Sequence, residues 1–279
     1  KLLPTAWGPP DNSHDSQIVV ISLIRTPRVR VAALFGAGLA IGEAQIQGLF
    51  QNPLASPDLL GSSSGGALGA VIALATGLAT HSIYYLPLFA FIGAWLALVI
   101  VYLLARQRGQ MSVTTLLLAG IALNALLGAM TSLIITLSSV PAEMSREIIF
   151  WLIGGLDSRT WTHVWIILPF VLSGGLMALL YTRDLDILLL GQETAYSLGV
   201  EVAQVTRVIL TSTALLTGAA VAVSGVVGFV GLIIPHIVRL LIGPKHRSLI
   251  PASALLGATF LVLADLLARI IHRPEEIRL

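Results

Sequence analysis

Long stretches with few or no charged residues constrain this chain more than any other feature of its sequence. A helix needs about 20 apolar residues to cross the hydrocarbon layer of a membrane. The segments that reach this length are 31–50, 82–105, 111–142, 161–182, 208–238 and 249–271. Charged residues make up only 11% of the 279 residues, against about 25% in a soluble domain. Most of the surface of this protein must therefore face lipid.

These segments are expected to be helices, because an open strand edge cannot satisfy its backbone hydrogen bonds in lipid. Segment 208–238 is too long for one span, and its glycines and Pro235 predict two helices joined by a tight bend. A weaker apolar stretch, 61–79, begins with the polar run GSSSGG. Small residues four apart, such as Gly65 and Gly69, predict close helix packing. We therefore expect an all-α polytopic membrane protein with about eight transmembrane helices.

Two connections between these spans carry patterns of their own. The connection 143–161 spaces Met144, Ile148 and Trp151 close to one face of a helix. This spacing predicts a short amphipathic helix on the membrane surface. The connection 183–207 has an apolar pattern interrupted by two glycines, which predicts a structured loop.

Several motifs, in order along the chain, resemble one family of membrane permeases. They are RTPRVRVAALFGAGLA, QGLFQNPLASPDLLG, LLLAGIALN, FWLIGGLDSRTW, LGVEV, GAAVAVSGVVGFVGLIIPHIVRLLIGPKHRSLIPASALLGA, ADLLAR and RPEE. Their order and spacing are similar to those of FecCD/BtuC-type permeases, which carry iron–siderophore, haem and cobalamin complexes. The resemblance runs from about Arg25 to Glu276, and 218–257 is its most specific part.

The resemblance implies the permease fold of a type II ABC importer, as a single transmembrane domain over residues 1–279. Family members have ten helices, with one span before RTPR and one after PEE, so we expect the first and last family helices to be missing here. Two permease copies, identical or homologous, would form the pathway in a bacterial inner membrane. Two ATP-binding subunits and a periplasmic or lipid-anchored substrate-binding protein would complete the importer, with lipid around it and no nucleic acid.

The implied activity is transport without catalysis. The chain has no GxxxxGK[ST] motif to hold ATP phosphates, so ATP and magnesium are expected on partner subunits, with no cofactor or metal on this chain. Iron–siderophore is the first expected substrate, before haem and cobalamin. The alternative function is an ion-coupled secondary transporter with Glu43 and Asp265 as ion sites. An intramembrane enzyme is disfavoured because no motif such as HExxH is present.

The charged turn between Pro235 and Pro251 resembles the cytoplasmic coupling helices of the family. Such helices must be short, rigid elements that move when the ATPase subunits close. The expected contacts with those subunits are His236, Arg239, Gly243, Lys245, His246 and Arg247. The alternative is an ordinary solvated loop with basic side chains that reach the membrane surface. A metal site at the two histidines is disfavoured, since they lack ligand spacing and a carboxylate partner.

Three arginines match family positions at the outer mouth of the pathway, where arginines meet acidic residues of the binding protein. They are Arg25, Arg28 and Arg269. A guanidinium group suits this contact because its fork pairs with a carboxylate through two bonds. The alternative is anchoring to lipid phosphates. In this orientation more Lys and Arg residues lie outside than inside, which is opposite to the positive-inside rule. Binding to an acidic partner protein would account for the arginines on the outer side.

Four further residues are expected along the pathway. Ser112 and Thr114 match small hydroxyl residues that constrict the family pathway at its cytoplasmic end, and Ser112 would equally serve as a helix N-cap. Glu43 departs from the family pattern and shares a helix face with Gln47, so both are expected to line the pathway and contact substrate. The alternative for Glu43 is a protonated side chain bonded to a neighbouring helix.

Overall fold

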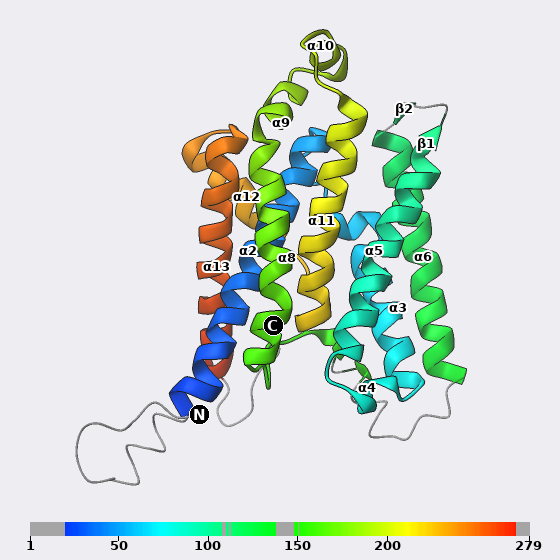
Figure 1. Cartoon of the computed structure of the whole chain (residues 1–279), viewed down its shortest axis with the longest axis vertical. Helices are drawn as coiled ribbons and strands as arrows, with labels where there is room; N and C mark the ends of the chain where they lie inside the picture. The colour runs from blue at the N-terminus through cyan, green and yellow to red at the C-terminus, as the bar shows by residue number, and fades with distance from the viewer. Residues whose placement is uncertain (1–19, 108–109, 112, 138–147, 150, 272–279) are drawn as a thin grey trace, which may run out of the picture.

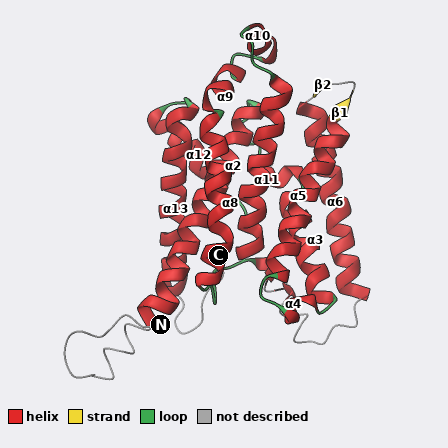
Figure 2. Cartoon of the chain, in the orientation of Figure 1, coloured by secondary structure: helices red, strands yellow, loops and turns green. Residues whose placement is uncertain are grey.

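The computed structural model describes residues 20–107, 110–111, 113–137, 148–149 and 151–271, and helices dominate these parts of the chain (Figure 1 and Figure 2). The longest helices are α2 (Thr26–Phe50), α5 (Tyr85–Ala105), α6 (Val113–Leu137), α8 (Trp161–Leu180), α11 (Val202–Ser224) and α13 (His246–Ile271). The shorter ones are the π-helical turn η1 (Val20–Arg25), the 3-10 turn η2 (Pro57–Leu60), α3 (Ser62–Ala75), α4 (Leu78–His81), α9 (Thr182–Leu188), α10 (Gln192–Ser197) and α12 (Val230–Ile242). Strands β1 (Arg106–Gln107) and β2 (Gln110–Met111) form a small antiparallel pair between α5 and α6.

The six longest helices are each apolar and long enough to cross a membrane, while α3 and α12 are apolar but shorter. These eight elements correspond to the eight spans expected from the sequence, which confirms the all-helical membrane fold. The predicted bend within 208–238 is confirmed too, because α11 ends at Ser224 and α12 begins at Val230. Gly225 makes this turn at φ +76°, a conformation that a residue with a Cβ atom rarely adopts.

Helix α2 runs through the middle of the bundle, with α8, α11, α12 and α13 packed around it (Figure 1). Every residue from Ala40 to Phe50 is buried, including Glu43 and two glutamines. A polar side chain at such depth requires a partner inside the protein. The C-terminal half of α2 is therefore a place where polar contacts between helices must form.

Glycines set the closest helix crossings. A Cβ atom at Gly36 of α2 would lie 2.2 Å from the carbonyl oxygen of Gly257 in α13. A Cβ atom at Gly65 of α3 would lie 2.3 Å from the carbonyl oxygen of Gly93 in α5. Such backbone contact gives two helices dispersion contacts that lipid cannot replace. The prediction of close packing at Gly65 and Gly69 is confirmed, since Gly69 also abuts the backbone of α5.

The structure tests both predicted connections. The structured loop is confirmed as α9 and α10, with Gly191 and Gly199 in positive-φ turns after them. In the other connection, Ile148 and Trp151 are helical and buried, and Trp151 packs on small residues of α3, α5 and α11. These apolar side chains contact protein, which corrects the prediction that they lie on the membrane surface. Met144 lies outside the described residues.

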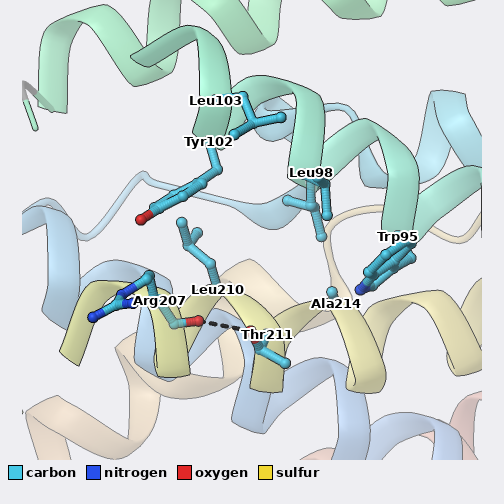
Figure 3. A pocket seen from close by; sticks show the side chains of 9 residues that line it. Trp95, Leu98, Tyr102, Leu103, Arg207, Leu210, Thr211 and Ala214 are labelled. Carbon is cyan, nitrogen blue, oxygen red and sulfur yellow. Dashed lines mark hydrogen bonds between the residues drawn. The ribbon is translucent and has the colours of Figure 1, made fainter. Parts of the chain in front are cut away.

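A groove of about 290 Å³ opens between α5 and α11 (Figure 3). Tyr102 and Arg207 lie at one end and Trp95 at the other, and Thr211 Oγ1 donates a hydrogen bond to the backbone oxygen of Arg207. The rest of the lining is apolar and consists of Leu98, Val99, Leu103, Leu210 and Ala214. A surface of this kind between two spans suits hydrocarbon, so we do not assign the groove to a polar substrate.

Candidate functional site

The two sets of basic residues singled out in the sequence lie at opposite ends of the bundle. Helix α13 has 26 residues, which makes it about 39 Å long at 1.5 Å per residue. His246 is its first residue and Arg269 lies in its last turn. Arg28, near the start of α2, lies beside the second of these ends because it pairs with Asp265. The two ends are thus far enough apart to serve partners on opposite sides of a membrane.

At the end that carries Arg269, two arginines and two aspartates form a closed cluster. Arg28 bonds Asp265 through Nε at 3.1 Å and through Nη2 at 2.8 Å, and its Nη2 also lies 3.2 Å from Asp157. Arg269 Nη2 lies 3.1 Å from the other carboxylate oxygen of Asp265. The Asp265 side chain is 3% exposed, so its charge depends on these arginines for compensation.

This cluster gives Arg28 a structural role that the sequence did not indicate, and its role in docking stays a prediction. Its side chain is 12% exposed and bonded within the chain, so it ties α2 to α13. Arg269 is partly exposed and Arg25 is exposed, and both remain predicted contacts for a binding protein. Sequence analysis did not find this role of Asp265, although one signal was available, because an aspartate inside an apolar span requires a compensating cation.

At the other end, the turn between α12 and α13 presents both apolar and basic side chains. His236, Lys245 and Arg247 are exposed. Gly243 adopts φ +92° where the chain leaves α12, which explains the glycine at this position. Exposed apolar residues end α12, namely Leu240, Leu241 and Ile242. This part of the predicted coupling surface is accessible to a partner.

Two of the predicted coupling residues point into the protein. His246 is 1% exposed and its Nδ1 lies 2.7 Å from Asp186 Oδ1, so its side chain lies inside the protein instead of on the surface of the turn. Arg239 is half-buried, and its Nη2 donates a hydrogen bond to Gln47 Oε1 at 3.1 Å. The carboxylate partner of His246 was not foreseen, because Asp186 precedes it by 60 residues.

Helices α9 and α10 form a second exposed surface at the same end, which sequence analysis did not single out. They project beyond the bundle, and α10 lies furthest out (Figure 1). The exposed apolar side chains of these helices and the turns beside them are Leu189, Leu190, Tyr196 and Leu198. Exposed apolar side chains grouped on a projecting element mark a protein interaction site. The signal available in the sequence was the apolar pattern of 183–207, which was interpreted only as a structured loop.

Glu43 and Gln47 face neighbouring elements of the same chain. Ser56 Oγ donates a hydrogen bond to Glu43 Oε1 at 2.8 Å. A Cβ atom on Gly231 of α12 would lie 2.4 Å from Glu43 Cγ, so the glutamate fits because α12 has a glycine there. Gln47 Nε2 donates to the backbone oxygen of Leu232 at 3.4 Å. Both side chains are buried, which favours the alternative of a glutamate bonded within the protein. A place for Glu43 and Gln47 along the pathway stays a prediction.

The partly buried turn before α3 holds a second acidic side chain. Ser63 Oγ donates a hydrogen bond to Asp58, and Asn124 Nδ2 donates to the backbone oxygen of Asp58 at 2.7 Å. Burial raises the pKa of the Asp58 carboxyl group, and the hydrogen bond from Ser63 opposes that rise. Within the described part of the chain, no three His, Asp or Glu side chains gather closely enough to hold a metal ion. We interpret this turn as a joint between α3 and α6.

Comparison with known proteins decides which family the chain represents. The model of the FecCD transport family matches residues 6–279. The chain belongs to the FecCD transport family. The family assignment made from the motifs in the sequence is therefore confirmed.

Individual relatives of this FecCD permease agree with the family match. The ABC transporter permease YvrB of Bacillus subtilis (strain 168) is 48% identical over 91% of this chain and 72% of its own length. The cobalamin import permease BtuC of Halobacterium salinarum is 42% identical over 95% and 70%, and the hemin transport permease HmuU of Yersinia pestis is 41% identical over 98% and 81%. A solved inward-facing structure of a metal-chelate type ABC transporter is similar with a TM-score of 0.88 at 32% identity, over 99% of this chain and 87% of that one.

This FecCD permease is therefore the membrane subunit of an ABC importer for metal chelates and a multi-pass protein of the cell membrane. It is not itself an ATPase, since ATP hydrolysis in such importers belongs to other subunits. The alternative of an ion-coupled secondary transporter loses its support.

The predicted constriction of the FecCD permease lies at the start of α6. Thr114 is exposed there, and Ser112 lies outside the described residues. Helix α6 stands at the edge of the bundle against α3 and α5, and much of it is exposed. A constriction at these two residues stays a prediction.

Replacement of Glu43 in this FecCD permease tests whether its side chain stays inside the protein. We expect Glu43→Gln to leave uptake rate and substrate selectivity unchanged, because glutamine keeps an oxygen that accepts the Ser56 hydrogen bond. We expect the free energy of unfolding to change by less than about 1 kcal/mol. Uptake in vesicles and thermal unfolding in detergent check both. A changed preference between substrates would show that Glu43 reaches the pathway after all.

Proposed function

We propose that this permease carries an iron(III)–siderophore complex into the cell, powered by ATP hydrolysis on two separate subunits. Relatives named for iron(III) citrate in Bacillus subtilis and Escherichia coli are 40% and 39% identical to it, and one named for iron(III) hydroxamate is 36% identical. Iron chelates recur among these names, which supports placing them first. Haem and cobalamin follow, because the relatives named for hemin and cobalamin are about as similar.

The observation that carries the ATP-driven mechanism is the gathering of exposed contacts at one end of the bundle. The projection of α9 and α10 supplies Tyr196, which is 78% exposed. The turn between α12 and α13 supplies Lys245 and Arg247. A mixture of apolar and charged groups on short helices suits the docking of a soluble subunit. We therefore assign this end to the cytoplasm and to the ATP-binding subunits, which hold the ATP and magnesium.

The remaining partners follow from the same orientation. A periplasmic or lipid-anchored binding protein would dock at the opposite end, where Arg25 and Arg269 are accessible. A second permease copy, identical or homologous, would complete the pathway. Closure of the ATP-binding subunits would then shift the permease pair between its outward-open and inward-open states.

The experiment that tests the proposed function uses the complete importer reconstituted in liposomes. The permease, its ATP-binding subunits and its binding protein are supplied with radiolabelled ferric siderophore, haem or cobalamin in separate assays. We expect the liposomes to transport the ferric siderophore only when ATP is present on the side of the membrane that carries the ATP-binding subunits. The control is an ATP-binding subunit with its phosphate-binding lysine replaced, which should abolish uptake.

Two results would contradict the proposed function in different ways. Uptake of haem or cobalamin without uptake of any ferric siderophore would show that the substrate assignment is wrong. Uptake of any of the three that persists with the disabled ATP-binding subunit would show that the mechanism is wrong.

A further inference from the structure

We infer that Asp186 is a positioning residue that transmits movement of the α9–α10 projection to the long helices α13 and α2. This inference rests on the proposed function, because it takes the ATP-binding subunits as the source of that movement. It names the side chains through which the force passes, which the family match does not provide. The contact lies just inside the projection, where α9 meets the bundle.

One oxygen of Asp186 accepts two hydrogen bonds from a single residue. Asp186 Oδ1 lies 2.8 Å from the backbone nitrogen of His246 and 2.7 Å from its ring Nδ1. A carboxylate group can only accept, so Nδ1 carries the proton. His246 is the first residue of α13, and the first backbone N–H groups of a helix have no partner within it. Asp186 therefore caps α13 with a negative charge at its N-terminus, where the helix dipole favours one.

The His246 ring is held on its other side by α2. A Cβ atom at Gly48 would lie 2.2 Å from His246 Nε2, so the ring occupies the space that a side chain on α2 would fill. A second link runs from Gln51, the residue that follows α2, whose Nε2 donates a hydrogen bond to the backbone oxygen of Leu188 at the end of α9. Helix α9 is thus fastened to two long helices at once.

The same two turns of α2 also reach α12. Gln47, which directly precedes Gly48 in α2, accepts a hydrogen bond from Arg239 of α12. A displacement of α9 that keeps the Asp186 bonds must move the His246 ring and the start of α13, and the ring has no free space on the α2 side. Packed interiors transmit such shifts because they contain little empty volume. Without Asp186, we expect the α9–α10 projection to move without moving α13 and α2.

The experiment compares three variants of the permease in the complete importer: Asp186→Ala, Asp186→Asn and Asp184→Ala. Asparagine keeps the accepting oxygen. Asp184 lies on the same helix two residues away, where its side chain points in a different direction. ATP hydrolysis and substrate uptake are measured in the same liposomes, together with the amount of ATP-binding subunit retained. For Asp186→Ala we expect the ATP-binding subunits to be retained and ATP hydrolysis to be nearly unchanged. We expect uptake per ATP hydrolysed to fall by about tenfold, which corresponds to the loss of hydrogen bonds to a charged group.

The other variants keep the inference falsifiable. Asp186→Asn and Asp184→Ala should both stay close to the wild-type ratio of uptake to hydrolysis. If Asp186→Ala lowers hydrolysis and uptake in equal proportion, or behaves like Asp184→Ala, the transmitting role is wrong. If the Asp186→Ala importer does not assemble, Gly48→Ala replaces it as the test, because the added methyl group displaces the His246 ring while Asp186 remains. An unchanged ratio of uptake to hydrolysis in Gly48→Ala would then overturn the inference. Absence of ATP-dependent uptake in the wild type would overturn the proposed function and this role with it.

Discussion

Replacing Asp265 with asparagine is expected to lower the free energy of unfolding by about 3–5 kcal/mol, the usual effect of breaking a buried ion pair by removing one partner. Asp265 is the shared anion of Arg28 and Arg269, and the Arg28 side chain is largely buried with it. Asparagine keeps the size of the side chain but leaves two guanidinium groups close together with one carboxylate fewer. Unfolding of the purified permease in detergent, followed by heat or denaturant, measures the loss.

Asp157 provides the matched control for this prediction. Its side chain is 34% exposed and it lies 3.2 Å from Arg28, so water can replace much of what asparagine removes. We expect Asp157→Asn to cost about 1 kcal/mol or less. Equal losses from the two variants would contradict the view that burial makes Asp265 the essential member of the cluster.

Replacing Gly65 with valine is expected to destabilise the permease by about 3 kcal/mol, at the upper end of the cost of overpacking a core. A Cβ atom there would lie 2.3 Å from the backbone oxygen of Gly93 and 2.7 Å from the Cβ atom of Ala97. Neither neighbour can turn aside, because one is backbone and the other has no rotatable side chain. Helices α3 and α5 would have to separate along their closest crossing. The unfolding assay used for Asp265 also measures this change.

Gly128→Val tests whether the loss comes from the crossing or from valine itself. Gly128 lies in α6, where no described atom would come within 4 Å of an added Cβ atom. Valine is a better helix former than glycine by a few tenths of a kcal/mol, so we expect little change or a slight gain in stability. A large loss at Gly128 as well would show that valine disturbs these helices wherever it is placed.

The membrane fold could be predicted because lipid permits few alternatives. Long uncharged runs must become helices, and a run such as 208–238 that exceeds one span must turn, which it does at Gly225. The loop glycines Gly191 and Gly199 likewise marked the limits of α9 and α10. These conclusions depend on residues close together in the sequence, where backbone chemistry decides the outcome.

The pairing of the charged residues could not be predicted in the same way. Arg28 and Asp265 are separated by 237 positions and His246 and Asp186 by 60, so no local pattern connects them. The sequence around a basic residue near a membrane interface does not show whether its partner is another subunit, a lipid phosphate or an acidic residue of its own chain. Only the fold shows that Arg28 and His246 are bonded internally while Arg25, Lys245 and Arg247 are exposed.

The two glycine crossings each join two helices through direct backbone contact. Backbones that touch at Gly36 and Gly257 join α2 to α13, and those that touch at Gly65 and Gly93 join α3 to α5. Neither pair can slide without first separating. Helix α11 packs against both pairs, and at Gly218 it meets the ring of Phe91 instead of a backbone. Rotation of a ring is easier than separation of two backbones, so we expect a shift between the two helix pairs to occur along the contact of α11 with α5.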